Sequence, residues 1–404
     1  MSIPKLRFNE FNGSWTTKKI DEIAIVTSGG TPSRNVAKYW NGHIPWVTTS
    51  LVNFNIISNA EEFITQEGVD NSSAKLFPKN TILMAMYGQG ITRGKVAILN
   101  IEATTNQACA AIKLKDGLNT HFVFQNLMNR YEEIRDLSNE GGQKNLSAGI
   151  IKDILISFPS KLEQTKIASF LSSVDEKIAQ LTQKHELLSE YKQGMMQKIF
   201  SQQIRFKARD GSEFGEWIKV RLKDILISYR LGGNYSNSEF KTSYPLIKMG
   251  NLSRGSINLD KIEYIPNDEK IDKEDLIKTN DLFFNTRNTL DLVDKVAIWK
   301  DELPQAYYNS NLMRLEFENN IFMNYLFNEQ STLEKLKSIA SGTTSVAAIY
   351  TKDLLKINLE IPCLEEQTKI ANFLSVIDQK IEVVAQQIEQ AKQWKKGLLQ
   401  QMFV

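Results

Sequence analysis

The sequence predicts an α+β protein in which two globular mixed α/β domains are separated by two long helices that form an antiparallel coiled coil. Three observations predict this fold. The chain contains an internal pseudo-twofold repeat, each copy ends in a long apolar heptad pattern, and the rest of each copy holds short apolar runs bounded by Gly, Asn and Asp. The length of 404 residues is enough for roughly two to four domains, each with its own core.

The composition is that of an ordinary globular protein, with 42% hydrophobic and 24% charged residues. No stretch approaches the roughly 18 consecutive apolar residues of a membrane span, and the N-terminus lacks the apolar segment of a signal peptide. The two cysteines, Cys109 and Cys363, lie in different repeats, which argues against a disulfide framework and predicts a cytoplasmic location. The net charge of +2 is too small to indicate a nucleic-acid-binding protein by itself.

The internal repeat is clearest in two segments. Residues 163–171 (EQTKIASFL) return as 366–374 (EQTKIANFL), and the match continues without a gap to the end of the chain. Upstream, residues 95–98 (KVAI) return as 295–298. Between such anchors the two copies diverge almost completely, which is typical of one scaffold that carries two different binding surfaces.

The end of each copy predicts a long helix. Its apolar positions alternate by three and four residues, as in a coiled coil, and they are interrupted by His185, Lys192 and Lys395. Helical packing inside a single globular domain is the alternative interpretation. The expected boundaries are a first globular domain at 1–157, a helix at 158–203, a second domain at 204–361 and a second helix at 362–404. The packing positions are Ile167, Leu171, Val174, Ile178 and Leu181 in the first helix and Ile370, Leu374, Ile377, Ile381 and Val384 in the second.

The globular part of each copy has the pattern of a mixed α/β domain. Short apolar runs bounded by Gly, Asn and Asp predict strands at 81–87, 96–99 and 108–112, and again at 281–284 and 295–299. Short helices are expected around 120–137 and 321–339.

The sequence offers few candidates for catalysis. The run 90–96 (GITRGKV) lacks the spacing and the final hydroxyl of a P-loop, and the three histidines lack metal-binding spacing. We interpret the pair Gly29 and Gly30 as a turn and the cluster 268–270 (DEK) as solvated surface. The chain is therefore not expected to be a self-sufficient enzyme, and no metal site is predicted.

With the repeat established, the chain resembles the DNA-specificity subunit of type I restriction–modification enzymes. Each motif is weak alone, but their order and their duplication are specific. They are the two helices that begin EQTKIA and the segments 28–32 (SGGTP), 39–46 (YWNGHIPW), 105–108 (TNQA), 142–147 (GQKNLS), 244–251 (YPLIKMGN), 282–288 (LFFNTRN) and 308–312 (YNSNL).

This resemblance implies two target recognition domains, each of which recognises one half of a bipartite site in double-stranded DNA. It also implies that the helices set the spacing between the half-sites and bind two methyltransferase subunits, through which motor–nuclease subunits attach. The specificity subunit carries no chemistry in that family. S-adenosylmethionine, ATP and magnesium are therefore expected in the partner subunits, and no cofactor is expected in this chain.

Recognition of DNA requires cations that contact phosphates and side chains that bond to base edges. The run 285–288 (NTRN) is the best candidate, because Arg suits guanine and Asn suits adenine. For many of these residues a turn or a solvated surface is the alternative interpretation. The candidates are Arg34, Lys38, Tyr39, Thr48, Thr49, Gln89, Arg93 and Lys144 in the first copy and Arg230, Tyr235, Lys248, Asn251, Arg254, Arg287, Asn288 and Thr343 in the second.

Two other functions remain open from the sequence. A self-contained nuclease or methyltransferase would act on DNA alone, given S-adenosylmethionine and magnesium. A coiled-coil adaptor that joins two non-DNA ligands would not bind duplex DNA with the steep salt dependence of phosphate contacts.

Overall fold

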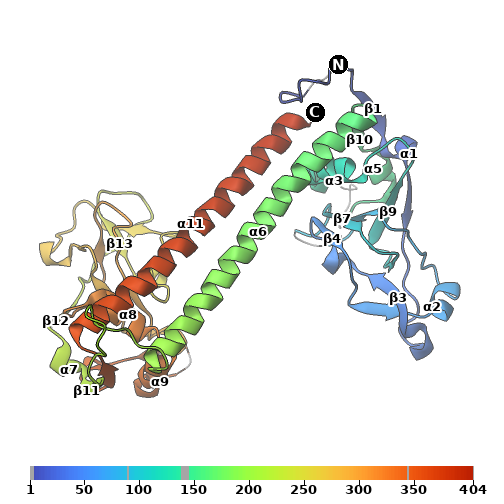
Figure 1. Ribbon diagram of the computed structural model, residues 1–404. Coiled ribbons are helices and arrows are strands. Elements are labelled where there is room, and N and C mark those ends of the chain that lie inside the picture. The colour runs from blue at the N-terminus through green and yellow to red at the C-terminus, as the bar shows by residue number, and fades with distance from the viewer. Residues whose placement is uncertain (1–3, 89–90, 138–144, 344, 404) are drawn as a thin grey trace. The chain divides into compact units, whose positions relative to one another are not determined.

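The computed structural model describes residues 4–88, 91–137, 145–343 and 345–403. By its contacts the chain divides into unit 1, residues 1–183 with 385–404, and unit 2, residues 184–384. The long helices α6 (Lys161–Phe200) and α11 (Leu364–Met402) each contribute one half to each unit (Figure 1). The helices lie within a few residues of the predicted ranges, but the division into units passes through them.

The globular domain of unit 1 is built on a five-stranded sheet of order β2-β9-β6-β7-β4. Its central strands are buried on both faces, which explains their continuous apolar sequence. Ile82 and Met84 face one core with the helices, whereas Leu83 and Ala85 face a second core. The strands are β2 (Ala24–Ser28), β4 (Asn55–Ile57), β6 (Ile82–Ala85), β7 (Val96–Leu99) and β9 (Cys109–Leu114), and the helices are α1 (Ile20–Ile23), α2 (Gln66–Asp70), α3 (Thr120–Asn129), α4 (Tyr131–Asp136) and α5 (Ala148–Asp153).

A second, three-stranded sheet of unit 1 has the order β5-β3-β8. It consists of β3 (Trp40–Val47), β5 (Glu62–Ile64) and β8 (Thr104–Thr105), and β3 runs parallel to β8. The one-turn helices η1 (Ala37–Tyr39) and η2 (Thr49–Leu51) flank β3. These turns carry several of the candidate DNA-binding residues.

Unit 2 repeats the plan with shorter strands. Its main sheet has the order β12-β19-β15-β17, and Leu282 and Phe284 of β15 face the helices while Phe283 faces a second core. The elements are β12 (Ser228–Leu231), β13 (Pro245–Ile247), β14 (Glu263–Tyr264), β15 (Leu282–Asn285), β16 (Arg287–Asn288), β17 (Val296–Ile298), β18 (Tyr307–Tyr308), β19 (Leu312–Glu316), β20 (Ser341–Gly342), β21 (Ala347–Ala348), α7 (Leu222–Ile225), α8 (Asn320–Phe327), α9 (Gln330–Ile339), α10 (Thr351–Leu354), η3 (Met249–Asn251) and η4 (Lys273–Asp275). The predicted strands are confirmed, and each predicted short helix is a pair of helices.

In each unit the strand that enters the globular domain pairs with the strand that leaves it. β1 (Thr16–Lys19) pairs antiparallel with β10 (Leu155–Phe158), which leads into α6. β11 (Ile218–Arg221) pairs in the same way with β22 (Asn358–Ile361), which leads into α11. Both ends of each domain are therefore tied to the start of a long helix.

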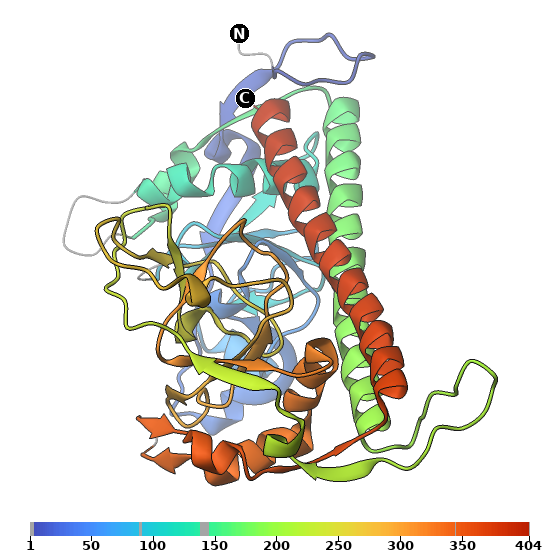
Figure 2. The ribbon, with the colours of Figure 1, turned by 90° about the vertical axis from the view of Figure 1, so that its left-hand side faces the viewer.

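The long helices pair antiparallel within each unit (Figure 2). In unit 2, Lys192 of α6 lies 2.6 Å from Asp378 of α11, and in unit 1, Lys395 of α11 lies 2.5 Å from Asp175 of α6. The two pairs occupy equivalent positions of the repeat. Two of the interruptions in the predicted heptad pattern are therefore ion pairs between the helices, a device that can fix helix orientation and register.

The predicted packing positions are buried, with Ile178 and Ile381 partly buried. All of them except Leu181 and Val384 also join the globular cores. Phe403, at the end of α11, packs against Phe122 of unit 1 with ring centroids 5.2 Å apart, and Phe200, at the end of α6, packs 5.9 Å from Phe322 of unit 2. Both interpretations of the heptad pattern therefore apply, because the same helices pair with each other and complete the domain cores.

A buried ion pair is repeated where the chain approaches each long helix. Arg7 holds Glu163 at 2.7 and 2.8 Å, and Arg205 holds Glu366 at 2.7 and 3.2 Å. The Glu163 and Glu366 side chains are only 2% and 0% exposed. Each arginine also donates to a backbone carbonyl of the glycine that precedes its domain. The pair thus fixes the entry segment of each domain to the first turn of its helix.

Candidate nucleic-acid interface

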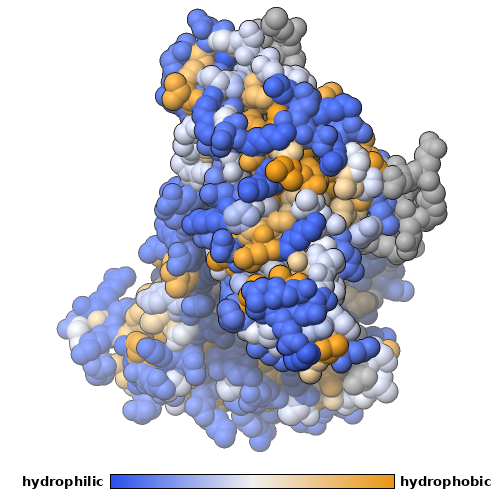
Figure 3. Space-filling model, turned by 90° about the vertical axis from the view of Figure 1, so that its right-hand side faces the viewer, coloured by the Kyte–Doolittle hydropathy of each residue, from blue (hydrophilic) through white to orange (hydrophobic). Residues whose placement is uncertain are grey.

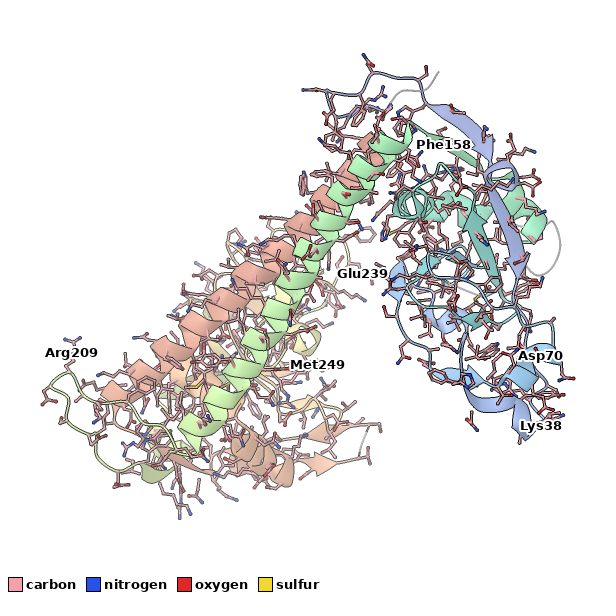
Figure 4. All side chains as sticks on the ribbon, turned by 45° about the vertical axis from the view of Figure 1, so that its right-hand side comes forward. Lys38, Asp70, Phe158, Arg209, Glu239 and Met249 are labelled. Carbon is pink, nitrogen blue, oxygen red and sulfur yellow. The ribbon has the colours of Figure 1, made fainter. Side chains whose placement is uncertain are left out.

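In unit 1 two of the candidate cations, Arg34 and Lys38, lie at the end of the domain remote from the start of α6. Figure 4 shows Lys38 and Asp70 at this end and Phe158 at the other. The Arg34 guanidinium lies 3.7 Å from the ring centroid of Trp40 and 4.8 Å from that of Trp46. Glu62 pairs with Arg34, and this hydrogen bond lowers the pKa of the Glu62 carboxyl. A hollow of about 470 Å³ opens beside Arg34 and Trp40.

The neighbouring candidates lie in the turns beside β3. Lys38, in η1, pairs with Glu67 of α2, and Tyr39 follows it with a half-buried ring. Thr48 and Thr49 are half-buried at η2, where the Thr48 hydroxyl lies 2.6 Å from that of Ser50. Both side chains are more than half exposed, so each keeps N–H donors in solvent that could bind a phosphate beside its carboxylate partner.

The remaining three candidates of the first copy are one nearly buried arginine and two residues outside the described part of the chain. Arg93 is only 9% exposed, and its Nε donates to the carbonyl of Arg135 at 3.2 Å, so it has a structural role. Gln89 and Lys144 lie outside the described residues. Their contact with DNA stays a prediction.

In unit 2, Arg230 and Tyr235 belong to a polar network around a buried carboxylate. Asp275, with a 2% exposed side chain, accepts from Arg230 Nε at 3.1 Å and from the Tyr235 hydroxyl at 2.6 Å. Arg230 also pairs with Asp272 at 2.6 Å. Burial, followed by the bond to Asp275, raises the pKa of Tyr235, which keeps this phenol a neutral donor. The network orders η4 and leaves part of Arg230 exposed.

Asn251 and Arg254 both bond to other groups of their own domain. Asn251 is 5% exposed, and its amide donates to the carbonyls of Asn258 and Lys261 at 3.0 and 2.8 Å. Arg254 lies 2.8 Å from Asp294, whose side chain is fully buried. An unpaired buried carboxylate is costly, so this arginine stabilises the domain. Lys248 pairs with Glu263 at 2.8 Å.

The structure brings the last three candidates together. β16, which consists of Arg287 and Asn288, pairs with β21, and β21 pairs with β20, which Thr343 follows directly. Arg287 is exposed, whereas the Asn288 side chain accepts from the backbone of Thr289 at 2.8 Å. A positive, amide-bearing edge of this kind can bond to phosphates and to base edges.

The described residues contain no group of three or more His, Cys, Asp or Glu side chains that could hold a metal ion. The predicted turn at Gly29 is a close packing contact, because a Cβ there would lie 2.1 Å from the Thr105 carbonyl oxygen. Gly232 makes the equivalent approach to Tyr308 in unit 2. Within the described part of the chain, no helix is long and apolar enough to cross a membrane.

The profile of the type I restriction modification DNA specificity domain matches this chain twice, at residues 12–190 and 215–393. The chain belongs to this family. It is a type I specificity subunit with two specificity domains, in agreement with the resemblance, and the family does not favour the adaptor or the self-contained enzyme.

Similar proteins cover the chain to different extents. The MjaIX specificity subunit of Methanocaldococcus jannaschii is 31% identical over 60% of this chain and 59% of its own length, so the match spans under two thirds of that relative. The MjaVIII specificity subunit of the same organism is 26% identical over 97% of this chain and 94% of its own. A crystal structure of the type I S subunit from M. genitalium, 17% identical, has the same fold with a TM-score of 0.62 over 100% of this chain and 99% of its own.

The sequence did not reveal several residues that contact the candidate cations of the specificity subunit. Trp40 and the buried Trp46 belong to the motif at 39–46 and lie on one strand, β3, but their contact with Arg34 depends on how the chain before η1 folds back over that strand. Glu62 and Glu67 pair with candidate cations from segments about 28 residues away. The available signal was the alternation of aromatic and basic residues in 34–46.

Proposed function

We propose that each globular domain of this specificity subunit recognises one half of a bipartite site in double-stranded DNA. The observation that carries this proposal is the duplicated domain, with a shared scaffold and divergent turns, held on one antiparallel helix pair. Equivalent scaffold contacts, such as Arg7–Glu163 and Arg205–Glu366, support a common frame. Different side chains on the two domains support different half-sites.

We further propose that the outer face of the helix pair binds two methyltransferase subunits. In unit 2 this face exposes Leu187, Tyr191, Val376 and Val383, each 49–57% exposed. In unit 1, Trp394, at the position equivalent to Tyr191, is 55% exposed and lies beside a hollow of about 360 Å³ lined by both helices. Exposed apolar side chains on a helix are typical of a surface that packs against partner helices.

The chain itself supplies recognition and assembly, and the chemistry belongs to its partners. S-adenosylmethionine is assigned to the methyltransferase subunits. ATP and magnesium are assigned to motor–nuclease subunits, which attach through the methyltransferase subunits. We place the whole complex in the cytoplasm. On the face of unit 1 shown in Figure 3, small hydrophobic patches alternate with hydrophilic residues, a mixture that suits both apolar and polar contacts with a partner.

Reconstitution tests this proposal. The chain with its methyltransferase subunits should methylate duplex DNA at one bipartite sequence, and genome-wide methylation mapping with and without the chain should reveal that sequence. Binding should weaken steeply with salt, because phosphate contacts release counterions. Methylation or cleavage by the purified chain alone, with S-adenosylmethionine and magnesium, would contradict the assignment of chemistry to the partners.

A further inference from the structure

The outer strand of the main sheet of unit 2 carries a row of exposed apolar side chains. β12, labelled in Figure 1, lies at one edge of the order β12-β19-β15-β17. Ile227, which directly precedes this strand, and Tyr229 and Leu231 within it are 59%, 49% and 47% exposed. Side chains two residues apart lie on the same face of a strand, so these three form one row, the β12 stripe. Adjacent exposed apolar side chains are typical of an interaction site.

The β12 stripe continues a face of the sheet that is otherwise covered by helices. In the ladder with β19, Tyr229 lies opposite Leu315, and Leu231 follows opposite Met313. Leu315 and Met313 are only 0% and 1% exposed. They belong to the core that contains residues of α8 and α9. The stripe is therefore the uncovered margin of this apolar face.

In unit 1 the equivalent positions are buried. Val26 and Ala24 precede Tyr229 and Ile227 by 203 residues, the offset that also separates the two EQTKIA segments. Val26 is 8% exposed and Ala24 is 2% exposed, because α5 packs against β2. α10, which corresponds to α5, is four residues long where α5 has six, and it packs against α9. The shorter helix leaves the β12 stripe exposed in unit 2.

We propose that β12 pairs antiparallel with β12 of a second copy of this chain, so that each copy covers the stripe of the other. An edge strand presents a row of backbone N–H and C=O groups that its one neighbour does not bond. The Gly232 N–H donates to the Leu312 carbonyl at 3.2 Å. Since alternate residues of an antiparallel strand bond to a given neighbour, Tyr229 and Leu231 direct their backbone groups away from β19. These are the groups that an added strand can bond.

The side chains of β12 suit an antiparallel copy in one register. With Tyr229 opposite its own counterpart, Ile227 lies opposite Leu231 of the second copy, and Ser228 lies opposite Arg230. All the apolar side chains then share one face, and no like charges are opposed. The next register, centred on Arg230, places two arginines opposite each other, which is unfavourable. Because the same strand serves both copies, a twofold axis relates them and assembly stops at a dimer.

The surface beside the stripe has room for the second copy. A hollow of about 330 Å³ opens next to Ile227 and is lined by Leu226, Phe317 and Met323. The favoured register places Leu231 of the second copy beside Ile227, where this hollow can receive its side chain. Four strand residues per copy bury less than the roughly 1,200 Å² of a standard stable interface, so the dimer should be weak, with a micromolar Kd. This pairing does not depend on the proposed recognition of DNA.

Sedimentation of the full chain tests the pairing. The wild type should pass from monomer to dimer as its concentration rises through the micromolar range. Ile227→Lys and Leu231→Glu should each weaken self-association by about tenfold or more, because each places a charge against an apolar side chain of the second copy. An equimolar mixture of the two variants should restore the dimer, because the register brings the new ammonium opposite the new carboxylate.

Two further variants complete the test. Phe240→Lys changes a side chain that is 86% exposed and lies in the chain just before β13, whose sheet is separate from that of β12, and it should leave the dimer unchanged. Tyr229→Glu opposes two carboxylates at the centre of the register, and it should abolish the dimer even if one of the first two variants fails to fold. A wild-type chain that stays monomeric, a dimer that persists in the Tyr229 variant, or a mixture no tighter than its components would overturn the proposal. Loss of methyltransferase subunits from these variants with a monomeric wild type would assign the stripe to that partner instead.

Discussion

Removal of the Arg205 guanidinium should destabilise unit 2, because it leaves the buried carboxylate of Glu366 without its ion-pair partner. Arg205 bonds to both carboxylate oxygens of Glu366, at 2.7 and 3.2 Å, and the Glu366 side chain is fully buried. Arg205→Met keeps most of the length of the side chain and removes the charge. Glu366 then stays in the core without a partner, and breaking a buried pair in this way costs about 3–5 kcal/mol.

The lower end of this range is expected, because the Arg205 side chain is 20% exposed and water can partly replace it. A loss of about 3 kcal/mol lowers the Tm of a domain of this size by about 6–12 °C. Thermal unfolding of the whole chain measures the shift, and hydrogen exchange assigns it to unit 2, since a chain with two units need not unfold in one step.

Matched variants test the cause of this shift. Arg209→Met removes an exposed arginine of the same segment, labelled in Figure 4, and should leave the Tm unchanged. Glu366→Gln in the Arg205→Met background removes the stranded charge and should restore part of the loss. Arg7→Met should destabilise unit 1 instead, because Arg7 holds the equivalent Glu163. An Arg205→Met variant as stable as Arg209→Met, or additive effects of the Arg205 and Glu366 changes, would refute the reasoning.

Three further predictions concern the helices and the glycine turn. Lys192→Glu should weaken the helix pair by placing a carboxylate beside Asp378, and Asp378→Lys in the same chain should restore it, as circular dichroism melting can measure; no restoration would count against the ion pair. Deletion of one heptad from both α6 and α11 should change the gap between the methylated half-sites but not their bases, and methylation mapping that shows changed bases would contradict a spacer role. Gly29→Ala should lower the yield of folded protein, because the new Cβ would lie 2.1 Å from the Thr105 carbonyl oxygen, and a normally stable variant would show that the turn can relax.

The sequence predicted the repeated features of the fold and missed those that depend on the third dimension. Heptad spacing is a local property, so it revealed both long helices and their packing positions. Lys192 and Lys395 appeared as interruptions, because the aspartates that pair with them lie on the other helix and are set by its register. The core contacts of Phe200 and Phe403 were hidden for the same reason, since each closes a domain distant in sequence.

The candidate site, like the fold, could be predicted only where it depends on local sequence. Arg254 and Asn251 were proposed as DNA contacts from residue type alone. In the structure Arg254 pairs with a buried carboxylate, and the Asn251 amide donates to two backbone carbonyls. Whether such a side chain is buried depends on how the turn packs against the domain. No local sequence pattern of these divergent turns indicates that packing. The run that contains Arg287 could be identified because a polar pair of residues follows closely on a buried strand, and the β20–β21 hairpin was not anticipated because its strands are two residues long.

If each domain recognises its own half-site, a double variant of one domain should change one half-site alone, which methylation mapping can measure. Arg287→Ala with Asn288→Ala removes two polar side chains from the edge of unit 2, and removal of a bidentate hydrogen-bonded pair with a base costs about 1–3 kcal/mol of discrimination. We expect the bases of one half-site to become relaxed in this variant while the other half-site and the gap stay unchanged. Arg34→Ala should relax only the opposite half-site. Equal degradation of both half-sites by the Arg287/Asn288 variant would show that the two domains do not recognise separate half-sites.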